Sequence, residues 1–519
     1  MLPAYAVEVR GAWRSDVKRV VVRLVTCVVA TWVLVGCGDG TTDQSASPAV
    51  AIRTLAYVVT ECHDRPEGAF GRQRLEVLRG GSSTPVLIKE IDAFAGFKIP
   101  DLPVQWCTNV GLGRLGQFFL ASGVMQRLGV APDGNRIVFE ITDAFRVGEV
   151  ETELPENEKG IFVVGADGSG LRRLAPPSRD PTVQFDGGRF SKIAALFAFS
   201  PDGKTVAYTD RGPGPDGVEA VQIVTLDLDT GIRTPITRLP PSPPPRFDPT
   251  RPATESPFFV DANRIAFFST ANPDNLNPKQ ELVPFTVHRD GTQLSRGPQP
   301  TTDATSELVP QFIISGPAPS ASLLSKPTPA RGPQGFPILE LFLLDGDNLL
   351  QLTDFDREDI TDAVVSADGS RVFFNASADP CTDGRYTQCS GSNPHHNCQI
   401  FSVDRLGDDL RQLTAFDEGP TEHYEIGCYE STPPRHGCAA AFLSQDPHTG
   451  TLVFLSSCDP LHMPTRRGAP SQIYAMRPDG SGLRALTSAR GLFSDAQGFD
   501  ATELPGPFAY SSSSARSLR

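Results

Sequence analysis

The chain is poor in positive charge. Its 47 lysine and arginine residues are outnumbered by 61 aspartate and glutamate residues, and its formal net charge at pH 7 is −14. A chain of this charge repels polyanions, so nucleic acid and anionic lipid are disfavoured as its main partners. The acidic balance also suits the solubility of an exported protein. We therefore expect no nucleic-acid partner.

Catalytic motifs and long uninterrupted helices are also scarce. The sequence has no EF-hand spacing and no G-x-S-x-G nucleophile motif. We therefore expect no catalytic residue, no cofactor and no bound metal. The 47 glycines and 47 prolines interrupt helices and favour many short strands joined by turns.

An apolar run near the N-terminus predicts export and lipidation. Basic residues precede the run 24–35, which has the length of a signal-peptide core and is short for a membrane-spanning helix. The sequence Leu-Val-Gly-Cys that ends at Cys37 resembles the lipobox of bacterial lipoproteins. This resemblance implies that residues 1–36 are a signal peptide and that Cys37 carries the lipids. A plain membrane anchor or an ordinary signal peptide is the alternative.

Residues 37–50 are small and polar, and we expect them to form a flexible tether behind the lipidated cysteine. The residue after Cys37 is Gly38 rather than aspartate, which by the same resemblance does not specify retention in the inner membrane. We expect the protein in the bacterial cell envelope, anchored by lipid to the periplasmic face of the outer membrane or to the cell surface.

The cysteines outside this segment are expected to form disulfides. The chain has ten cysteines, and setting aside Cys27 and Cys37 leaves eight, an even number that favours disulfides in an exported protein. Six of them lie between residues 381 and 458, and their pairing stays open. Cys62 and Cys107 form a candidate pair because the other six cluster elsewhere. The eight candidates are Cys62, Cys107, Cys381, Cys389, Cys398, Cys428, Cys438 and Cys458.

A recurring hairpin organises the rest of the chain. In residues 196–209, two apolar runs flank Ser-Pro-Asp-Gly, whose proline and Asp-Gly pair favour a tight turn between antiparallel strands. We expect the aspartates of such turns to shape the backbone rather than to bind calcium or to act as acids and bases; they are Asp133, Asp202, Asp368 and Asp479. Further copies, some of them degenerate, begin near residues 54, 128, 258, 311, 363 and 439.

Each unit supplies about four short strands and cannot bury both faces alone, so neighbouring units must pack side by side. The pattern predicts an all-β fold, a β-propeller with seven four-stranded blades, or six if a weak unit merges with its neighbour. The first unit lacks its first strand, and residues 502–511 supply a spare strand that would complete the first blade and close the ring. We expect the propeller to span 51–510 and residues 511–519 to be a disordered polar tail.

Two stretches carry a family resemblance. F-S-P-D-G-K-T-V-A-Y at 199–208 and Q-I-Y-A-M-R-P-D-G-S-G-L-R-A-L-T at 472–487 resemble the repeats of TolB-type propellers, a WD-type class. Related repeats occur in the propeller domains of prolyl oligopeptidases. The resemblance implies the fold but little about function, because the motif residues make turns and core strands. TolB has an extra N-terminal α/β domain, whereas here the tether leads almost directly into strands.

Inserts that interrupt the repeat form the expected recognition surface. They lie at 379–398, 422–438 and 457–471, and they gather aromatic, histidine and arginine side chains on loops of a rigid scaffold. Zinc is less favoured there than disulfides, because paired C-x-x-C spacing is missing. Stapled loops without a ligand are the alternative. The candidate recognition residues are Arg385, Tyr386, His395, His396, His423, Tyr424, Tyr429, His436, His462 and Arg466.

These patterns favour a non-enzymatic, monomeric envelope lipoprotein whose propeller binds or scaffolds a protein, peptide or glycan. The alternative is an envelope hydrolase or lyase with its site at the propeller channel. An enzyme of the prolyl-oligopeptidase type would need a following α/β-hydrolase domain of about 200 residues, and only a short polar tail follows the last unit.

Overall fold

The structure is a computed structural model, and the residues that it describes all belong to the compact unit Pro48–Arg519. No helix among them is long and apolar enough to cross a membrane. The described residues are 52–80, 82–97, 125–142, 146–147, 150–151, 154–179, 197–244, 253–297, 311–313, 321–331, 337–345, 348–355, 360–366, 368–376, 378–382, 386, 388–394, 399–416, 440–446, 449–456 and 472–512.

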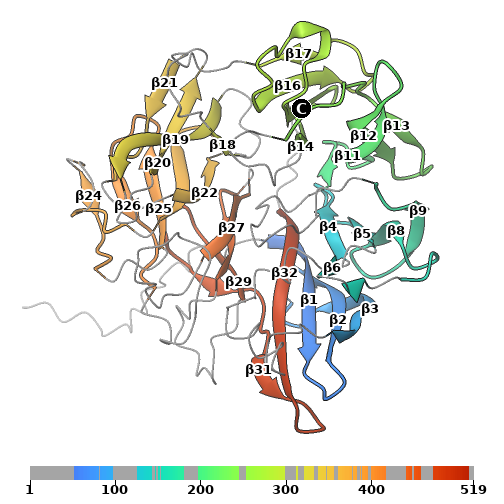
Figure 1. Cartoon of the computed structure of the whole chain (residues 1–519). Coiled ribbons are helices and arrows are strands. Elements are labelled where there is room, and N and C mark those ends of the chain that lie inside the picture. The colour runs from blue at the N-terminus through green and yellow to red at the C-terminus, as the bar shows by residue number, and fades with distance from the viewer. Residues whose placement is uncertain are drawn as a thin grey trace, which may run out of the picture. The chain divides into compact units, whose positions relative to one another are not determined.

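The described strands form seven sheets of four or five strands and one two-stranded ribbon, β6 (Arg146–Val147) with β7 (Val150–Glu151). We call the seven sheets blades 1 to 7 in the order in which the chain enters them, and Figure 1 shows their arrangement. Blade 1 contains β1 (Ile52–His63), β2 (Ala69–Arg79), β3 (Val86–Phe97), β31 (Gly491–Ser494) and β32 (Asp500–Ser512).

The other six blades follow in sequence order, each with its first strand paired to the second and the second to the third. Blade 2 is β4 (Met125–Val130), β5 (Arg136–Ile141), β8 (Gly160–Gly165) and β9 (Arg172–Ala175); blade 3 is β10 (Ala198–Phe199), β11 (Thr205–Pro213), β12 (Glu219–Asp227) and β13 (Arg233–Pro235); blade 4 is β14 (Thr254–Phe259), β15 (Arg264–Ser269), β16 (Val283–His288) and β17 (Ser295–Arg296).

Blade 5 is β18 (Gln311–Ile313), β19 (Ala321–Arg331), β20 (Pro337–Asp345) and β21 (Asn348–Gln351); blade 6 is β22 (Ile360–Val365), β23 (Arg371–Ala376), β24 (Cys389–Ser390), β25 (Gln399–Asp404) and β26 (Leu410–Gln412); blade 7 is β27 (Ala440–Gln445), β28 (Leu452–Ser456), β29 (Gln472–Met476) and β30 (Arg484–Ala485). A single 3₁₀ turn, η1 (Pro273–Asn275), is the one described helix.

The Ser-Pro-Asp-Gly hairpin forms as predicted. In blade 3 the carboxylate of Asp202 accepts hydrogen bonds from the Ser200 hydroxyl (2.6 Å) and from the Lys204 N–H (3.0 Å), and Gly203 has φ +66°. These hydrogen bonds lower the pKa of Asp202. Asp133, Asp368 and Asp479 accept the N–H two residues further along in the same way. The turn aspartates therefore stabilise the backbone of the repeat.

Buried apolar residues close the ring. They divide into seven clusters, and each cluster joins two neighbouring blades. Blade 3 packs on blade 2 through Tyr208 and on blade 4 through Ala207, because alternate residues of a strand face opposite sides of its sheet. The last cluster joins blade 7 to blade 1 through Leu55, Tyr57 and Ile473. The predicted all-β propeller is confirmed, with one sheet for each of the seven predicted units.

The C-terminal strand completes the first blade, also as predicted. β32 pairs antiparallel with β1, with Leu55 opposite Tyr510 and Cys62 opposite Thr502. In Figure 1 the N-terminal strands β1 to β3, in blue, accordingly lie beside the red β32. The strand reaches Ser512, two residues beyond the predicted limit of the propeller. Only closure by both ends of the chain removes the free edges of an open ring.

Several strands were not predicted, among them β6, β7, β19, β24 and β31. β19 carries Pro327 and Pro329 inside a segment rich in proline, and proline argues against a strand because it cannot donate to the ladder. It pairs with β20 from Ala321 to Pro327, and its register shifts between Pro327 and Arg331. β31 pairs only with the first residues of β32, beyond the repeat that the sequence defines.

The L-T ending of the repeat belongs to a buried hydrogen-bonded clamp between the third and fourth strands of a blade. In blade 7 the Thr487 hydroxyl donates to Gln472 Oε1 (2.7 Å) and accepts the Ile473 N–H (2.9 Å), while the Gln472 amide donates to the Ala489 carbonyl (2.9 Å). Blades 3 and 6 repeat this clamp with Gln222 and Gln399. It satisfies polar groups at the blade interface and so fixes the position of the last strand.

Candidate functional site: a groove at the seam of the propeller

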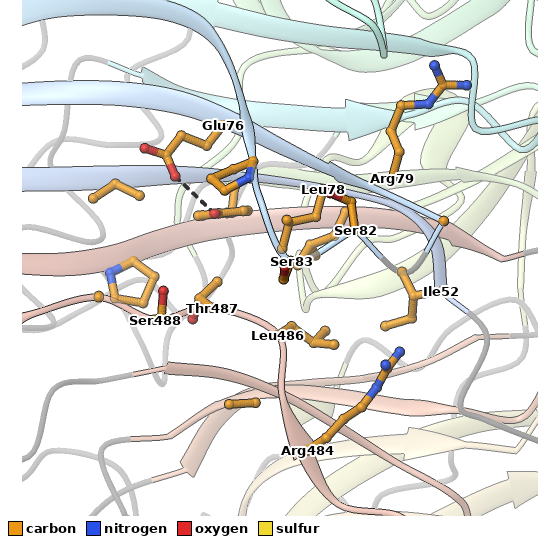
Figure 2. A pocket seen from close by; sticks show the side chains of 18 of the residues that line it. Ile52, Glu76, Leu78, Arg79, Ser82, Ser83, Arg484, Leu486, Thr487 and Ser488 are labelled. Atoms are coloured by element: carbon orange, nitrogen blue, oxygen red, sulfur yellow. Dashed lines mark hydrogen bonds between the residues drawn. The ribbon is translucent and has the colours of Figure 1, made fainter. Parts of the chain in front are cut away.

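A groove of about 510 Å³ lies between blade 7 and blade 1, where the two ends of the chain meet. Figure 2 shows it from close by, with Ser82 and Ser83 between Leu78 and Leu486 in this view. β1 contributes Leu55 and Val59 to its floor. Hydroxyl groups line the walls as well, so the groove presents apolar area together with a few polar groups, as peptide and small-molecule sites do.

The groove is open because one turn does not close it. In blades 3, 4, 6 and 7 a glycine in the turn between the third and fourth strands packs against the preceding blade; a Cβ built on Gly480 would lie 2.6 Å from the Leu413 carbonyl oxygen. The corresponding turn of blade 1 contains Gly80, and a Cβ built there meets no atom within 4 Å. The turn 79–85 therefore stands away from blade 7.

Charged groups sit at opposite sides of the groove. Figure 2 shows Glu76 on one side, hydrogen-bonded to the Tyr57 hydroxyl at 2.9 Å, and Arg79 and Arg484 on the other. Burial, with the neighbouring Glu76 carboxylate as the second cause, raises the pKa of Tyr57 well above its ordinary value, so this phenol stays protonated. The groove is thus acidic at one side and basic at the other.

Beyond the groove, blade 1 carries an ion-pair network that ties its two hairpins together. His63 lies between two carboxylates, with Nε2 2.8 Å from Glu61 and Nδ1 3.0 Å from Asp495. Arg490 pairs with Glu503 at 2.7 Å, and its guanidinium lies 3.7 Å from the centre of the Phe493 ring. The network holds the β31–β32 hairpin against β1.

Burial opposes ionisation of both carboxylates that face His63, but hydrogen bonds outweigh it. For Glu61 the hydrogen bonds from Arg74 and His63 lower the pKa, and for Asp495 those from Arg65 and His63 lower it far below the usual range. Both groups are therefore ionised at neutral pH. Among the described residues, no group of three or more His, Cys, Asp or Glu side chains is arranged to hold a metal ion.

Tyr386 is the one predicted recognition residue that falls among the described residues. It is half-buried, its ring lies 5.6 Å from that of Phe355, and its hydroxyl accepts a hydrogen bond from the Asp354 N–H (3.0 Å). Nearby, β24 pairs parallel with β26, so this part of the insert folds against the outer edge of blade 6. The other nine predicted recognition residues lie outside the described residues: Arg385, His395, His396, His423, Tyr424, Tyr429, His436, His462 and Arg466.

Three of the predicted disulfide cysteines are described, and all three are bonded. Cys381 pairs with Cys389, with their Cα atoms 5.6 Å apart, which closes the start of the insert in blade 6. Cys62, on β1, is also disulfide-bonded. Cys37 and the remaining predicted disulfide cysteines lie outside the described residues: Cys107, Cys398, Cys428, Cys438 and Cys458.

The sequence did not predict the groove, although it carries a usable signal. The turn 79–85 reads R-G-G-S-S-T-P and lacks the aspartate that tightens the equivalent turn of blades 2, 4 and 7. A longer turn without an Asx hydrogen bond has less reason to pack closely on its neighbour.

No protein-family model matches the chain, and none of the curated proteins matches it significantly. Solved structures give similarity at low identity. The β-propeller domain of the Trilobed protease from Pyrococcus furiosus aligns with a TM-score of 0.43 and 10% identity, over 86% of this chain and all of that one. An acylaminoacyl peptidase in complex with Z-Gly-Gly-Phe-chloromethyl ketone gives 0.42 and 11%, over 84% of this chain and 51% of that one.

Oligogalacturonate lyase from Vibrio parahaemolyticus gives a TM-score of 0.38 and 9% identity, over 78% of this chain and 94% of that one. The chain spans about half the length of the acylaminoacyl peptidase. At these identities the similarity concerns the fold alone. The protein is an all-β propeller.

Proposed function

We propose that the protein is a lipid-anchored binding module of the bacterial cell envelope, and that its propeller, of TolB type, binds an extended peptide segment in the seam groove. The observation that carries the proposal is the gap left by the turn 79–85, because every comparable glycine turn of blades 3, 4, 6 and 7 packs on its neighbour. A gap of about 510 Å³ is within the range of ligand-binding pockets.

The chemistry of the walls favours a peptide over a glycan. Leu78 and Leu486 line the groove, are only partly buried and offer apolar area to side chains, whereas sugar rings are usually held by stacking on aromatic faces and by many hydrogen bonds. Glu76, which also pairs with Arg74 at 3.1 Å, lies on one side and Arg79 and Arg484 on the other, so the groove offers partners of both signs to the charged side chains of such a segment. Extended segments can also bind beside an exposed sheet edge, and β30 is the edge strand of blade 7.

A random dodecapeptide library displayed on phage tests the proposal. Peptides selected on the purified chain are measured against two variants of the same turn. Ser83→Trp fills the groove, because Ser83 lines it, whereas Thr84→Trp changes a neighbouring exposed residue that does not. We expect Ser83→Trp to weaken the selected peptides about tenfold or more, equivalent to about 1.4 kcal/mol, and Thr84→Trp to leave their affinity unchanged.

Thermal unfolding of both variants verifies that they are folded. Selection of no peptide, or equal binding by the two variants, would overturn the proposal.

A further inference from the structure

Most of the exposed large apolar side chains that the structure describes lie at one end of the propeller. Eight large apolar residues among those that the structure describes are exposed, and six lie in, or within three residues of, the turn between the third and fourth strands of a blade. The six are Val86 and Leu87 of blade 1, Leu171 of blade 2, Ile232 of blade 3, Leu350 of blade 5 and Leu406 of blade 6.

Backbone hydrogen bonds place these turns at one end. In each of four blades the turn between the third and fourth strands is bonded to the turn between the first and second; in blade 2 the Ala166 N–H donates to the Asn135 carbonyl (2.9 Å), and in blade 6 the Arg405 N–H donates to the Ser370 carbonyl (3.0 Å). Neighbouring blades are linked at the same level, since the Thr54 hydroxyl donates to the Gly134 carbonyl (2.8 Å).

The chain enters the propeller at this end. β1 begins at Ile52, and the Gly80 N–H of the adjacent turn donates to the Arg53 carbonyl at 2.7 Å. We call this the tether end, because residues 37–51 join the propeller here. A segment of that length spans at most about 50 Å when fully extended. We therefore expect a lipid on Cys37 to hold the tether end within about 50 Å of the surface that carries the lipid.

The opposite end differs. It carries only two of the eight exposed apolar residues: Val218, between β11 and β12, and Phe499, between β31 and β32. Phe499 is partly covered, because the guanidinium of Arg65 lies 4.6 Å from the centre of its ring. Among the residues that the structure describes, more of the exposed apolar side chains thus lie at the end to which the tether is attached.

We propose that the tether end docks on the lipid surface that holds Cys37, with its apolar turn residues in the interfacial layer of the membrane. The inference rests on the anchor in the proposed function. The six residues come from five blades and are separated by polar turns, so they form no single compact patch of the kind that a protein partner covers. A fluid lipid surface can take up separate side chains, and their buried apolar area then adds to the membrane affinity that the lipid anchor provides.

Tryptophan fluorescence in uncharged vesicles tests the proposal. The lipidated full chain is reconstituted in phosphatidylcholine vesicles, with and without bromine on the acyl chains, because bromine quenches an indole only in close proximity. Leu406→Trp places the probe at the tether end, and Val218→Trp places it at the opposite end; both positions are exposed. The parent chain, measured in parallel, supplies the background.

We expect the Leu406→Trp chain to show a blue shift and a loss of emission in brominated vesicles, and the Val218→Trp chain to show neither. Equal responses of the two variants would overturn the proposal. A blue shift of Leu406→Trp without vesicles, accompanied by a doubled mass, would also overturn it and would make this end an interface between two copies.

Flotation of the parent chain with the vesicles distinguishes failure of the proposed lipid anchor from failure of the proposed docking. We expect the parent to float and the Cys37→Ser chain to float less. A parent that does not float refutes the anchor, and the docking proposal with it. A parent that floats while the Leu406→Trp signal is unquenched refutes the docking proposal alone.

Discussion

The interface between blades 6 and 7 and the one between blades 7 and 1 are made from the same repeat, but only the first is closed at its outer side. At the first, Gly480 packs so closely on Leu413 that no side chain fits between them. At the second, the turn that contains Gly80 stands free. Both interfaces nevertheless have an apolar core, and Tyr474 and Tyr57 are buried within them.

The difference shows that the ring closes without close packing of this turn, because both ends of the chain build the sheet of blade 1. At the seam β32 is hydrogen-bonded to β1 along almost its whole length, so the two ends of the chain are held together by a ladder. At the interfaces that blades 3, 4, 6 and 7 make with the preceding blade, a glycine turn packs closely on the neighbouring backbone. Because the ladder closes the ring, the turn 79–85 is free to leave the groove open.

Removal of β32 should have the largest effect on the stability of the propeller, because it takes away the strand that closes the ring. A chain ending at residue 501 loses the partner of β1 and opens the ring, and we expect it to lose its cooperative thermal transition, a loss comparable to a typical domain stability of about 5–15 kcal/mol. A chain ending at Ser512 retains the whole strand and serves as the control. Circular dichroism melts measure both, and an unchanged midpoint for the shorter chain would contradict closure by β32.

Substitution of each turn glycine by alanine should show directly how the packing of the two interfaces differs. Both glycines have positive φ, +82° at Gly480 and +47° at Gly80, so alanine costs about 1–2 kcal/mol at either position. Gly480→Ala must also displace the Leu413 carbonyl, and we expect a total of about 3 kcal/mol or more. The Cβ added by Gly80→Ala meets no atom within 4 Å, so this substitution should cost only the free energy that the positive φ imposes. Urea unfolding compares the two, and equal costs would mean that the seam is as tightly packed as its neighbour.

How far the sequence predicts this architecture depends on which interactions are local. The turn at Ser200–Gly203 is specified within four residues, since Asp202 bonds to the backbone two residues away, and such turns give the register of the blades. The closing role of β32 also followed from the sequence, because the first unit has one strand too few and the last has one too many.

The groove could not be predicted in the same way. Its existence depends on how far the turn 79–85 lies from Leu486, two segments about 400 residues apart that share no motif. Likewise, the clamp formed by Gln472 and Thr487 recurs in blades 3 and 6, yet the L-T ending alone does not reveal its glutamine partner. The extension of blade 1 by β31 depends on ion pairs such as that between Arg490 and Glu503, which have no counterpart in the repeat.

The smallest expected effect is that of low pH, and it is confined to β31 and the start of β32 in blade 1. The folded-state pKa values of Glu61 and Asp495 are lowered, so each carboxylate stabilises the fold above its unfolded pKa of about 4. That contribution is lost as the pH falls through the lower folded-state value. The protection factors of residues 491–503, taken relative to the intrinsic exchange rate at each pH, should therefore fall below about pH 4, while those of the hairpin formed by β4 and β5 change less.

Two variants sharpen this prediction. Asp495→Asn removes one of the two carboxylates and should lower the protection factors at the hairpin tip at pH 7 and make them less dependent on pH, because one of the two titrating groups is gone. Asp216→Asn changes an exposed carboxylate that bonds only to the backbone of its own turn in blade 3, and it should leave the tip unaffected. An acid response of the tip that survives in Asp495→Asn would assign the effect to Glu61, whereas a tip insensitive to acid in the parent chain would show that the ion pairs contribute nothing to holding β31 and β32 against β1.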